Sequence, residues 1–180
     1  MGFNSTIISK KKKLKCGCFD YNFSHGLCKM HATIESTKKR VDKFEEEQVD
    51  ESLSNLIADL DAIYSVYIRI KDADSKGMNE CYTCGTKLHW TDLQCGHFEK
   101  RSHMSTRFEH WNTKPQCRTC NEFKDGNEVE FKKHLEDDSK GITEWLSELS
   151  KQIQKFTIEE LKGMIADYRH KVQILKTKFK

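Results

Sequence analysis

The sequence is short of proline, of glycine and of apolar residues. It has one proline and nine glycines in 180 residues, and residues of the hydrophobic types make up 36% of it. Scarce proline together with 33% charged residues favours long helices over a sandwich or barrel of many short strands. A core with so few apolar residues needs another source of stability, which bound metal can supply.

Long apolar runs are missing as well. No run approaches the roughly 18 apolar residues that cross a bilayer, so we expect no membrane partner and no membrane segment. The lysines at 10–13 follow the apolar residues 3–8 instead of preceding them, which is the wrong order for a secretory signal. We therefore expect a cytoplasmic protein whose cysteines are reduced.

The eight cysteines are too few for a disulfide scaffold, but their spacing is typical of metal sites. The first group of candidate ligands lies near the N-terminus: Cys16, Cys18, Cys28 and His31. The second consists of two Cys-x-x-Cys pairs: Cys81, Cys84, Cys117 and Cys120. Four thiolates complete the tetrahedral shell of a structural Zn²⁺ ion and leave no open position for catalysis. We predict Zn²⁺ at both groups; the alternative for the first is buried thiols beside a surface histidine.

Charge is unevenly distributed along a chain whose formal net charge is +3. Lysines and arginines are concentrated in residues 1–40 and again from Lys162 onward, whereas residues 42–63 are acidic. Basic ends on a nearly neutral chain suggest an anionic partner such as nucleic acid. The alternative is that these charges only keep the surface solvated.

The pattern of apolar residues predicts an α+β protein that is mostly α. We divide the chain into four parts: a basic tail and N-terminal zinc loop over 1–32, a long amphipathic helix within 33–76, a zinc-bound core over 77–127 and C-terminal helices over 128–180. Two pairs of residues have the spacing of helix capping boxes, Asn127 with Glu130 and Thr157 with Glu160.

The residues between the two Cys-x-x-Cys pairs resemble the HNH nuclease motif, a ββα-metal finger inside a treble clef. His97, Asn112 and Asn121 follow one another in the order of that motif, and Asn121 comes directly after the second cysteine pair. The resemblance implies that His97 is the general base and that Asn121 binds Mg²⁺ or Mn²⁺. Asn112 would hold the loop and orient the imidazole, and Arg107 or Arg101 would bind the phosphate.

The flanking residues narrow the resemblance to one family. Residues 67–74, Gly96-His97-Phe98, Arg107-Phe108-Glu109, Gly126-Asn127 and residues 157–161 look like the NinG (Rap) family of phage recombination endonucleases. This resemblance implies cleavage of branched DNA, such as Holliday junctions and displacement loops, in a bacterial host cell. It also implies phage recombination or replication proteins as partners. The two-fold symmetry of a junction favours a homodimer.

One position departs from the HNH pattern. Many HNH enzymes have Asp or His immediately before the base histidine, where it also binds the metal, but this chain has Gly96. The metal then depends on Asn121, the DNA phosphate and water, and we expect weak binding without DNA. His103, His89 and Cys95 are alternatives for completing the shell, and the sequence does not choose between them.

Two other functions are compatible with the same residues. The chain is either a non-catalytic zinc module that binds DNA or RNA through its basic ends, or an adaptor whose helices recruit recombination proteins. In both cases His97 would lie beside the zinc site with no catalytic role.

Overall fold

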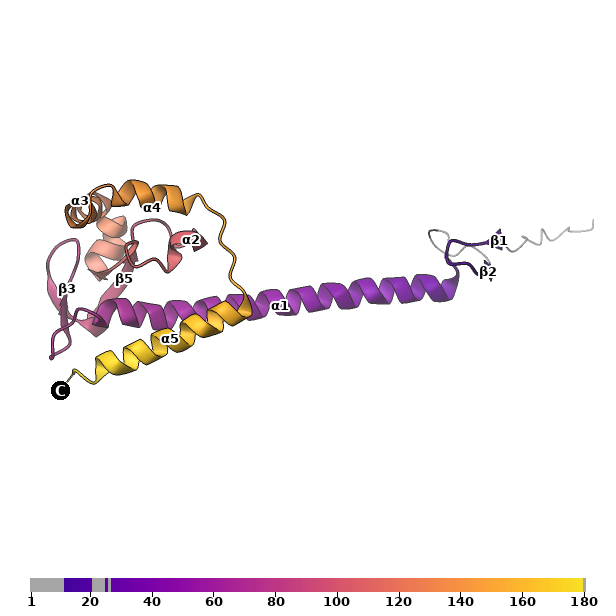
Figure 1. The fold of residues 1–180 in the computed structure, drawn as a ribbon, viewed down its shortest axis with the longest axis horizontal. Helices are drawn as coiled ribbons and strands as arrows, with labels where there is room; N and C mark the ends of the chain where they lie inside the picture. Colours follow the sequence, from indigo (N-terminus) through magenta and orange to yellow (C-terminus); the bar gives the residue numbers. More distant parts are fainter. Residues whose placement is uncertain (1–11, 21–24, 26, 180) are drawn as a thin grey trace, which may run out of the picture. The chain divides into compact units, whose positions relative to one another are not determined.

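The computed structural model describes residues 12–20, 25 and 27–179, which form two compact units divided after Glu51. The protein is mostly helical, with three small antiparallel sheets in the described part (Figure 1). None of the helices in these residues has the length and apolar character needed to cross a membrane. The basic tail over residues 1–11 lies outside the described residues. The four-part division of the chain is finer than this and stays a prediction.

The first unit contains a short hairpin and the beginning of a long helix. Strand β1 (Lys12–Lys13) pairs with β2 (Phe19–Asp20), and Gly17 in the connection has φ 83, a left-handed value that favours glycine. Helix α1 (Lys29–Ile70) begins and ends earlier than the predicted range of 33–76. It ends before Asp74, whose carboxylate accepts hydrogen bonds from two backbone amides and forms a turn.

Two hairpins open the central part of the second unit. Strand β3 (Met78–Glu80) pairs with β4 (Lys87–His89), and β5 (Leu93–His97) pairs with β6 (Thr113–Cys117) so that His97 lies opposite Thr113. Four short helical segments connect or follow the strands: η1 (Trp90–Asp92), α2 (Met104–Arg107), the π-helical turn η2 (Thr119–Phe123) and η3 (Asp125–Asn127).

Three helices complete the chain: α3 (Glu128–Asp138), α4 (Ile142–Ser150) and α5 (Ile158–Lys176). The predicted capping box of Thr157 and Glu160 is confirmed at the start of α5. The one predicted for Asn127 and Glu130 is wrong. Asn127 has a left-handed backbone at φ 50, and its side-chain amide lies 3.8 Å from the Cys120 sulfur instead of capping α3.

The largest buried cluster of the second unit lies between the end of α1 and α5. Its apolar side chains recur with helical spacing on both helices and bury Leu60, Tyr64, Ile68, Leu161 and Ile165. The Tyr64 hydroxyl also donates to Thr113 Oγ1 at 2.7 Å, since that oxygen itself donates to a backbone carbonyl. This bond ties α1 to β6 at Thr113, the residue that pairs with His97 at the end of β5.

Candidate metal sites and catalytic cavity

Four cysteines of the second unit converge on one point. The sulfur atoms of Cys81, Cys84, Cys117 and Cys120 all lie within 4.8 Å of one another. The Cys84 and Cys117 sulfurs are 3.8 Å apart. Two thiolates on one tetrahedral zinc ion are also about 3.8 Å apart, because each Zn–S bond is about 2.3 Å long. These residues therefore fit a structural zinc ion.

Hydrogen-bond donors surround this cysteine group. The Thr83 hydroxyl lies 3.4 Å from the Cys81 sulfur, and the Thr86 hydroxyl lies 3.2 Å from the Cys84 sulfur. Burial raises the pKa of the Cys81 thiol, but hydrogen bonds from Thr83 and from backbone amides outweigh burial and lower the pKa to about 6. The surroundings of Cys81 therefore favour its thiolate, which is the form that binds zinc. Burial instead raises the pKa of the Cys117 thiol to about 12 and also raises that of Cys120, so these two need the positive charge of the metal ion itself to lose their protons.

The first unit gathers a second group of ligands, Cys16, Cys18, Cys28 and His31, within the same 4.8 Å limit. His31 Nδ1 lies 3.0 Å from the Cys28 sulfur and 3.6 Å from the Cys18 sulfur. Cys28 precedes α1 and His31 lies in its first turn, so the start of the helix holds both side chains toward the hairpin cysteines. Three thiolates and one imidazole are a common zinc ligand set.

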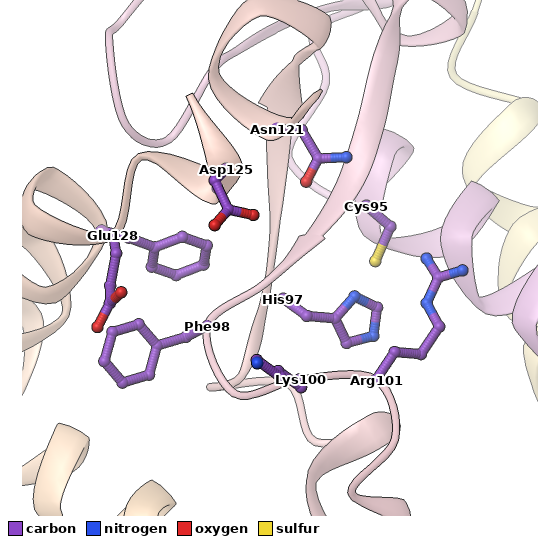
Figure 2. A pocket seen from close by; sticks show the side chains of 10 residues that line it. Cys95, His97, Phe98, Lys100, Arg101, Asn121, Asp125 and Glu128 are labelled. Carbon is purple, nitrogen blue, oxygen red and sulfur yellow. The ribbon is translucent and has the colours of Figure 1, made fainter. Parts of the chain in front are cut away.

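A cavity of about 300 Å³ lies between the end of β5 and the segment that follows β6. Its polar lining consists of His97, Lys100, Arg101, Asn121, Asp125 and Glu128 (Figure 2). The structure thus brings His97 and Asn121 to one cavity, although they come from different elements. Two cationic and two acidic side chains share it, so the cavity offers contacts both for an anion and for a metal cation.

One ring nitrogen of His97, Nε2, is engaged in a hydrogen bond to the backbone. It lies 3.0 Å from the backbone carbonyl oxygen of Arg107, which can only accept a hydrogen bond. Nε2 therefore carries the proton of the neutral ring, and Nδ1 keeps its lone pair. Burial lowers the pKa of His97, and the positive charge of Arg101 lowers it further, while backbone carbonyls offset part of the shift. The ring is therefore neutral at pH 7.

Asn112 is fully buried and makes no hydrogen bond to the imidazole. Its Oδ1 accepts from the Glu99 backbone amide at 2.6 Å, and its Nδ2 donates to the carbonyl oxygens of Thr106 at 2.9 Å and of Glu99 at 3.2 Å. These bonds hold the loop after His97 against α2. Asn112 therefore orients the ring indirectly, through the segment whose Arg107 carbonyl accepts from it.

The Arg107 side chain is paired with Asp61 on α1. Its Nε and Nη2 contact the two carboxylate oxygens, and its Nη1 donates to the Arg101 carbonyl oxygen at 3.2 Å. Both partners are only about one-fifth exposed, at 19% and 20%. The guanidinium thus joins α2 to α1 and does not line the cavity. Of the two arginines expected to bind phosphate, Arg101 is the one that lies there, next to Lys100.

Two acidic residues of the cavity were missed in the sequence. The carboxylates of Asp125 and Glu128 form no ion pair or side-chain hydrogen bond within the described part of the chain. Figure 2 shows the Asp125 carboxylate turned toward the same space as the Asn121 oxygen, whereas the Glu128 carboxylate lies farther from Asn121, beside Phe98. The only hint in the sequence is the four-residue spacing from Asn121 to Asp125, which on a helical turn brings two side chains to one side. It is weak, since acidic residues are common at the start of any helix.

The three alternatives for completing the metal shell lie in different places. Cys95 lines the cavity, but burial raises the pKa of its thiol to about 12, so it is protonated at neutral pH. His89 caps η1, with its Nδ1 2.7 Å from the Thr91 hydroxyl, and His103 precedes α2. Neither histidine lines the cavity.

The position before His97 has room only for glycine. A Cβ atom at Gly96 would lie 1.9 Å from Oε1 of Gln116, which is fully buried. Gln116 Nε2 donates to the Gly126 carbonyl oxygen at 2.7 Å and to the Thr83 hydroxyl at 3.1 Å, so the carboxamide is held in place. The space that a metal-binding side chain at position 96 would need is therefore filled by Gln116.

Comparison with known proteins adds one finding. The family model described as bacteriophage lambda NinG protein matches residues 10–178, which is nearly the whole chain. No curated protein and no solved structure gives a significant match.

Proposed function

Because the chain belongs to the NinG family, we propose that it is a metal-dependent endonuclease that hydrolyses phosphodiester bonds of branched DNA. The observation that carries the proposal is the single cavity lined by His97 and Asn121, with Lys100 and Arg101 beside them. A base, an oxygen ligand for a cation and positive side chains for phosphate are the groups that this reaction needs.

The surrounding elements support an HNH-like finger as the frame of this site. The β5–β6 hairpin is followed directly by the turn η2. Two cysteines at the end of β6 and in η2 converge with two from the connection between β3 and β4. His97 ends β5, Asn112 precedes β6 and Asn121 lies in η2. We assign the ββα-metal finger inside a treble clef on this order.

His97 acts as the general base in the proposed reaction. A water molecule in line with the bond to be broken loses its proton to Nδ1, the nitrogen that keeps a lone pair. The water oxygen bonds to phosphorus while the bond to the 3′ oxygen breaks, and that oxygen takes up a proton from solvent. The products are 5′-phosphate and 3′-hydroxyl ends. The lowered pKa of His97 keeps the base available at neutral pH.

Asn121 and Asp125 fit the divalent cation, because a carboxamide and a carboxylate oxygen are ligands that Mg²⁺ and Mn²⁺ prefer. Asp125 supplies the ligand that Gly96 lacks. When bound, the cation provides positive charge next to the phosphate and the leaving oxygen. The DNA phosphate and water would complete its shell, which makes binding without DNA weak.

Lys100 and Arg101 would hold the DNA backbone at the cavity, and such contacts read shape and charge instead of sequence. Binding should therefore weaken steeply as salt is raised. The preference for Holliday junctions and displacement loops rests on the NinG family. Two opposed cuts in a two-fold symmetric junction favour a homodimer, and phage recombination or replication proteins are the expected partners.

The test compares wild type with His97→Ala on a labelled four-way junction and a linear duplex. Ca²⁺ replaces Mg²⁺ in the inactive control, because a chelator would also remove zinc. The matched variant is His110→Ala, since His110 is exposed and lies outside the cavity. We expect Mg²⁺-dependent cutting of the junction that His97→Ala abolishes and His110→Ala retains, with junction binding unchanged. Binding without cutting by wild type would instead support a non-catalytic zinc module that binds nucleic acid.

A further inference from the structure

A chain of side-chain hydrogen bonds leads from the surface to Asn121. The exposed Arg118 donates through Nε to Glu122 Oε2 at 2.7 Å. The other carboxylate oxygen, Oε1, accepts from Gln94 Nε2 at 2.5 Å, and Gln94 Oε1 accepts from Asn121 Nδ2 at 2.7 Å. We call the Glu122 and Gln94 side chains the amide relay.

The chemistry of the groups fixes the direction of the amide relay. An ionised carboxylate only accepts hydrogen bonds, whereas a carboxamide has one accepting and one donating end. Glu122 therefore requires the NH₂ group of Gln94, which turns the Gln94 oxygen toward Asn121. That oxygen in turn requires the NH₂ group of Asn121. The Asn121 oxygen is left on the opposite side.

The opposite side is the cavity. Figure 2 shows the Asn121 oxygen turned toward Asp125 and His97, with the nitrogen turned away from them. Glu122 forms an ion pair with Arg118 at 2.7 Å, so the carboxylate that sets the direction only accepts hydrogen bonds.

We propose that Glu122 is a positioning residue that acts through Gln94 and commits Asn121 to present its oxygen, and not its amide protons, to a hard divalent cation. The inference rests on the proposed function, because there Asn121 has a cation to bind. Either end of a carboxamide fits the same space, and only the oxygen attracts a cation. The amide relay therefore determines whether the Asn121 side chain binds the cation through its oxygen or repels it with its NH₂ group.

Replacing the accepting carboxylate of Glu122 with a group that only donates hydrogen bonds tests the proposed orientation of Asn121 directly. In Glu122→Lys, the new ammonium group only donates, so the Gln94 oxygen turns toward it and the Gln94 NH₂ group turns toward Asn121. The Asn121 oxygen must then face Gln94, and its NH₂ group faces the cavity. Adding Gln94→Glu provides a carboxylate that accepts from the new ammonium and from Asn121 together. The double variant therefore restores the original direction with different atoms.

Arg118→Gln is the matched control. It removes the ion pair of Glu122 from the same exposed turn, but it leaves the carboxylate that accepts from Gln94. Because Glu122 itself is exposed, with a side-chain exposure of 40%, Glu122→Lys should leave zinc content and thermal unfolding close to wild type. Both are measured for every variant.

Two measurements on the zinc-loaded protein report on the amide relay. Mn²⁺ binding is titrated by electron paramagnetic resonance, and the side-chain NH₂ group of Asn121 is located by NMR through its nuclear Overhauser contacts. We expect Glu122→Lys to weaken Mn²⁺ binding about tenfold or more, the range for lost orientation of a metal ligand. The NH₂ contacts to residue 94 should disappear. The double variant should regain both, and Arg118→Gln should match wild type.

The inference is overturned if Glu122→Lys binds Mn²⁺ as wild type does, or if the double variant binds as weakly as the single one. Wild type that binds no Mn²⁺ at the cavity overturns it too. Junction cleavage is scored separately. If wild type binds Mn²⁺ and the double variant rescues binding, but no protein cuts DNA, the amide relay is supported and the nuclease proposal fails.

Discussion

Truncation of Asn112 should unfold the second unit at a much lower temperature. The Asn112 side chain is 0% exposed and makes three hydrogen bonds to backbone groups of Glu99 and Thr106. Each such bond contributes about 0.5–1.5 kcal/mol net, so Asn112→Ala should lower the free energy of unfolding by about 3 kcal/mol. For a unit of this size that corresponds to a fall of about 10 °C in Tm.

The assay is thermal unfolding of the zinc-loaded protein followed by circular dichroism. Asn121→Ala is the matched control, because it makes the same chemical change at a partly exposed site with one hydrogen bond. We expect a cost of about 1 kcal/mol or less there, with cutting lost. The reasoning about Asn112 is refuted if the two variants unfold at the same temperature.

Other variants test the remaining features. Gly96→Ala should lower the free energy of unfolding by about 1–3 kcal/mol in denaturant titrations, because its Cβ meets Gln116 Oε1. The double variant with Gln116→Ser should lose less stability than the two single variants added together. The cleavage rate should rise with pH through a midpoint below 6.5 and level off near pH 7, because the lowered pKa of His97 leaves the base unprotonated there; a midpoint above 6.5 would contradict this. Asp125→Asn should weaken Mn²⁺ binding while zinc content stays unchanged, and Cys117→Ser should remove one zinc per chain in atomic emission analysis and lower Tm.

Spacing in the sequence predicts the parts of the site that depend on local geometry. Two ligands separated by one or two residues, such as Cys16 with Cys18 or Cys81 with Cys84, can reach one ion whatever surrounds them, so both ligand groups are gathered as their spacing indicates. The apolar residues of α1 and α5 likewise follow the period of a helix packed on one side. The order of His97 and Asn121 relative to the cysteine pairs also places them in one cavity.

Contacts between distant segments leave no such signal. Nothing near Arg107 in the sequence indicates Asp61, which lies on another helix, so an arginine suited to phosphate proves to be engaged in an ion pair. The glycine at position 96 reads as a missing ligand until Gln116 is seen to fill its space from the neighbouring strand. Asn127 has the spacing of a cap, but its left-handed backbone turns it toward a cysteine.

The central claim is that Asn121 and Asp125 hold a cation at the phosphate that His97 faces. Anomalous X-ray scattering from manganese tests it most directly. Crystals of the zinc-loaded protein would be grown with Mn²⁺ and a four-way junction whose scissile phosphate resists hydrolysis. We predict a manganese peak about 2.1 Å from Asn121 Oδ1 and from an Asp125 oxygen, with His97 Nδ1 facing the phosphorus. A cavity without manganese, or a zinc peak bound to the His97 imidazole, would contradict the account.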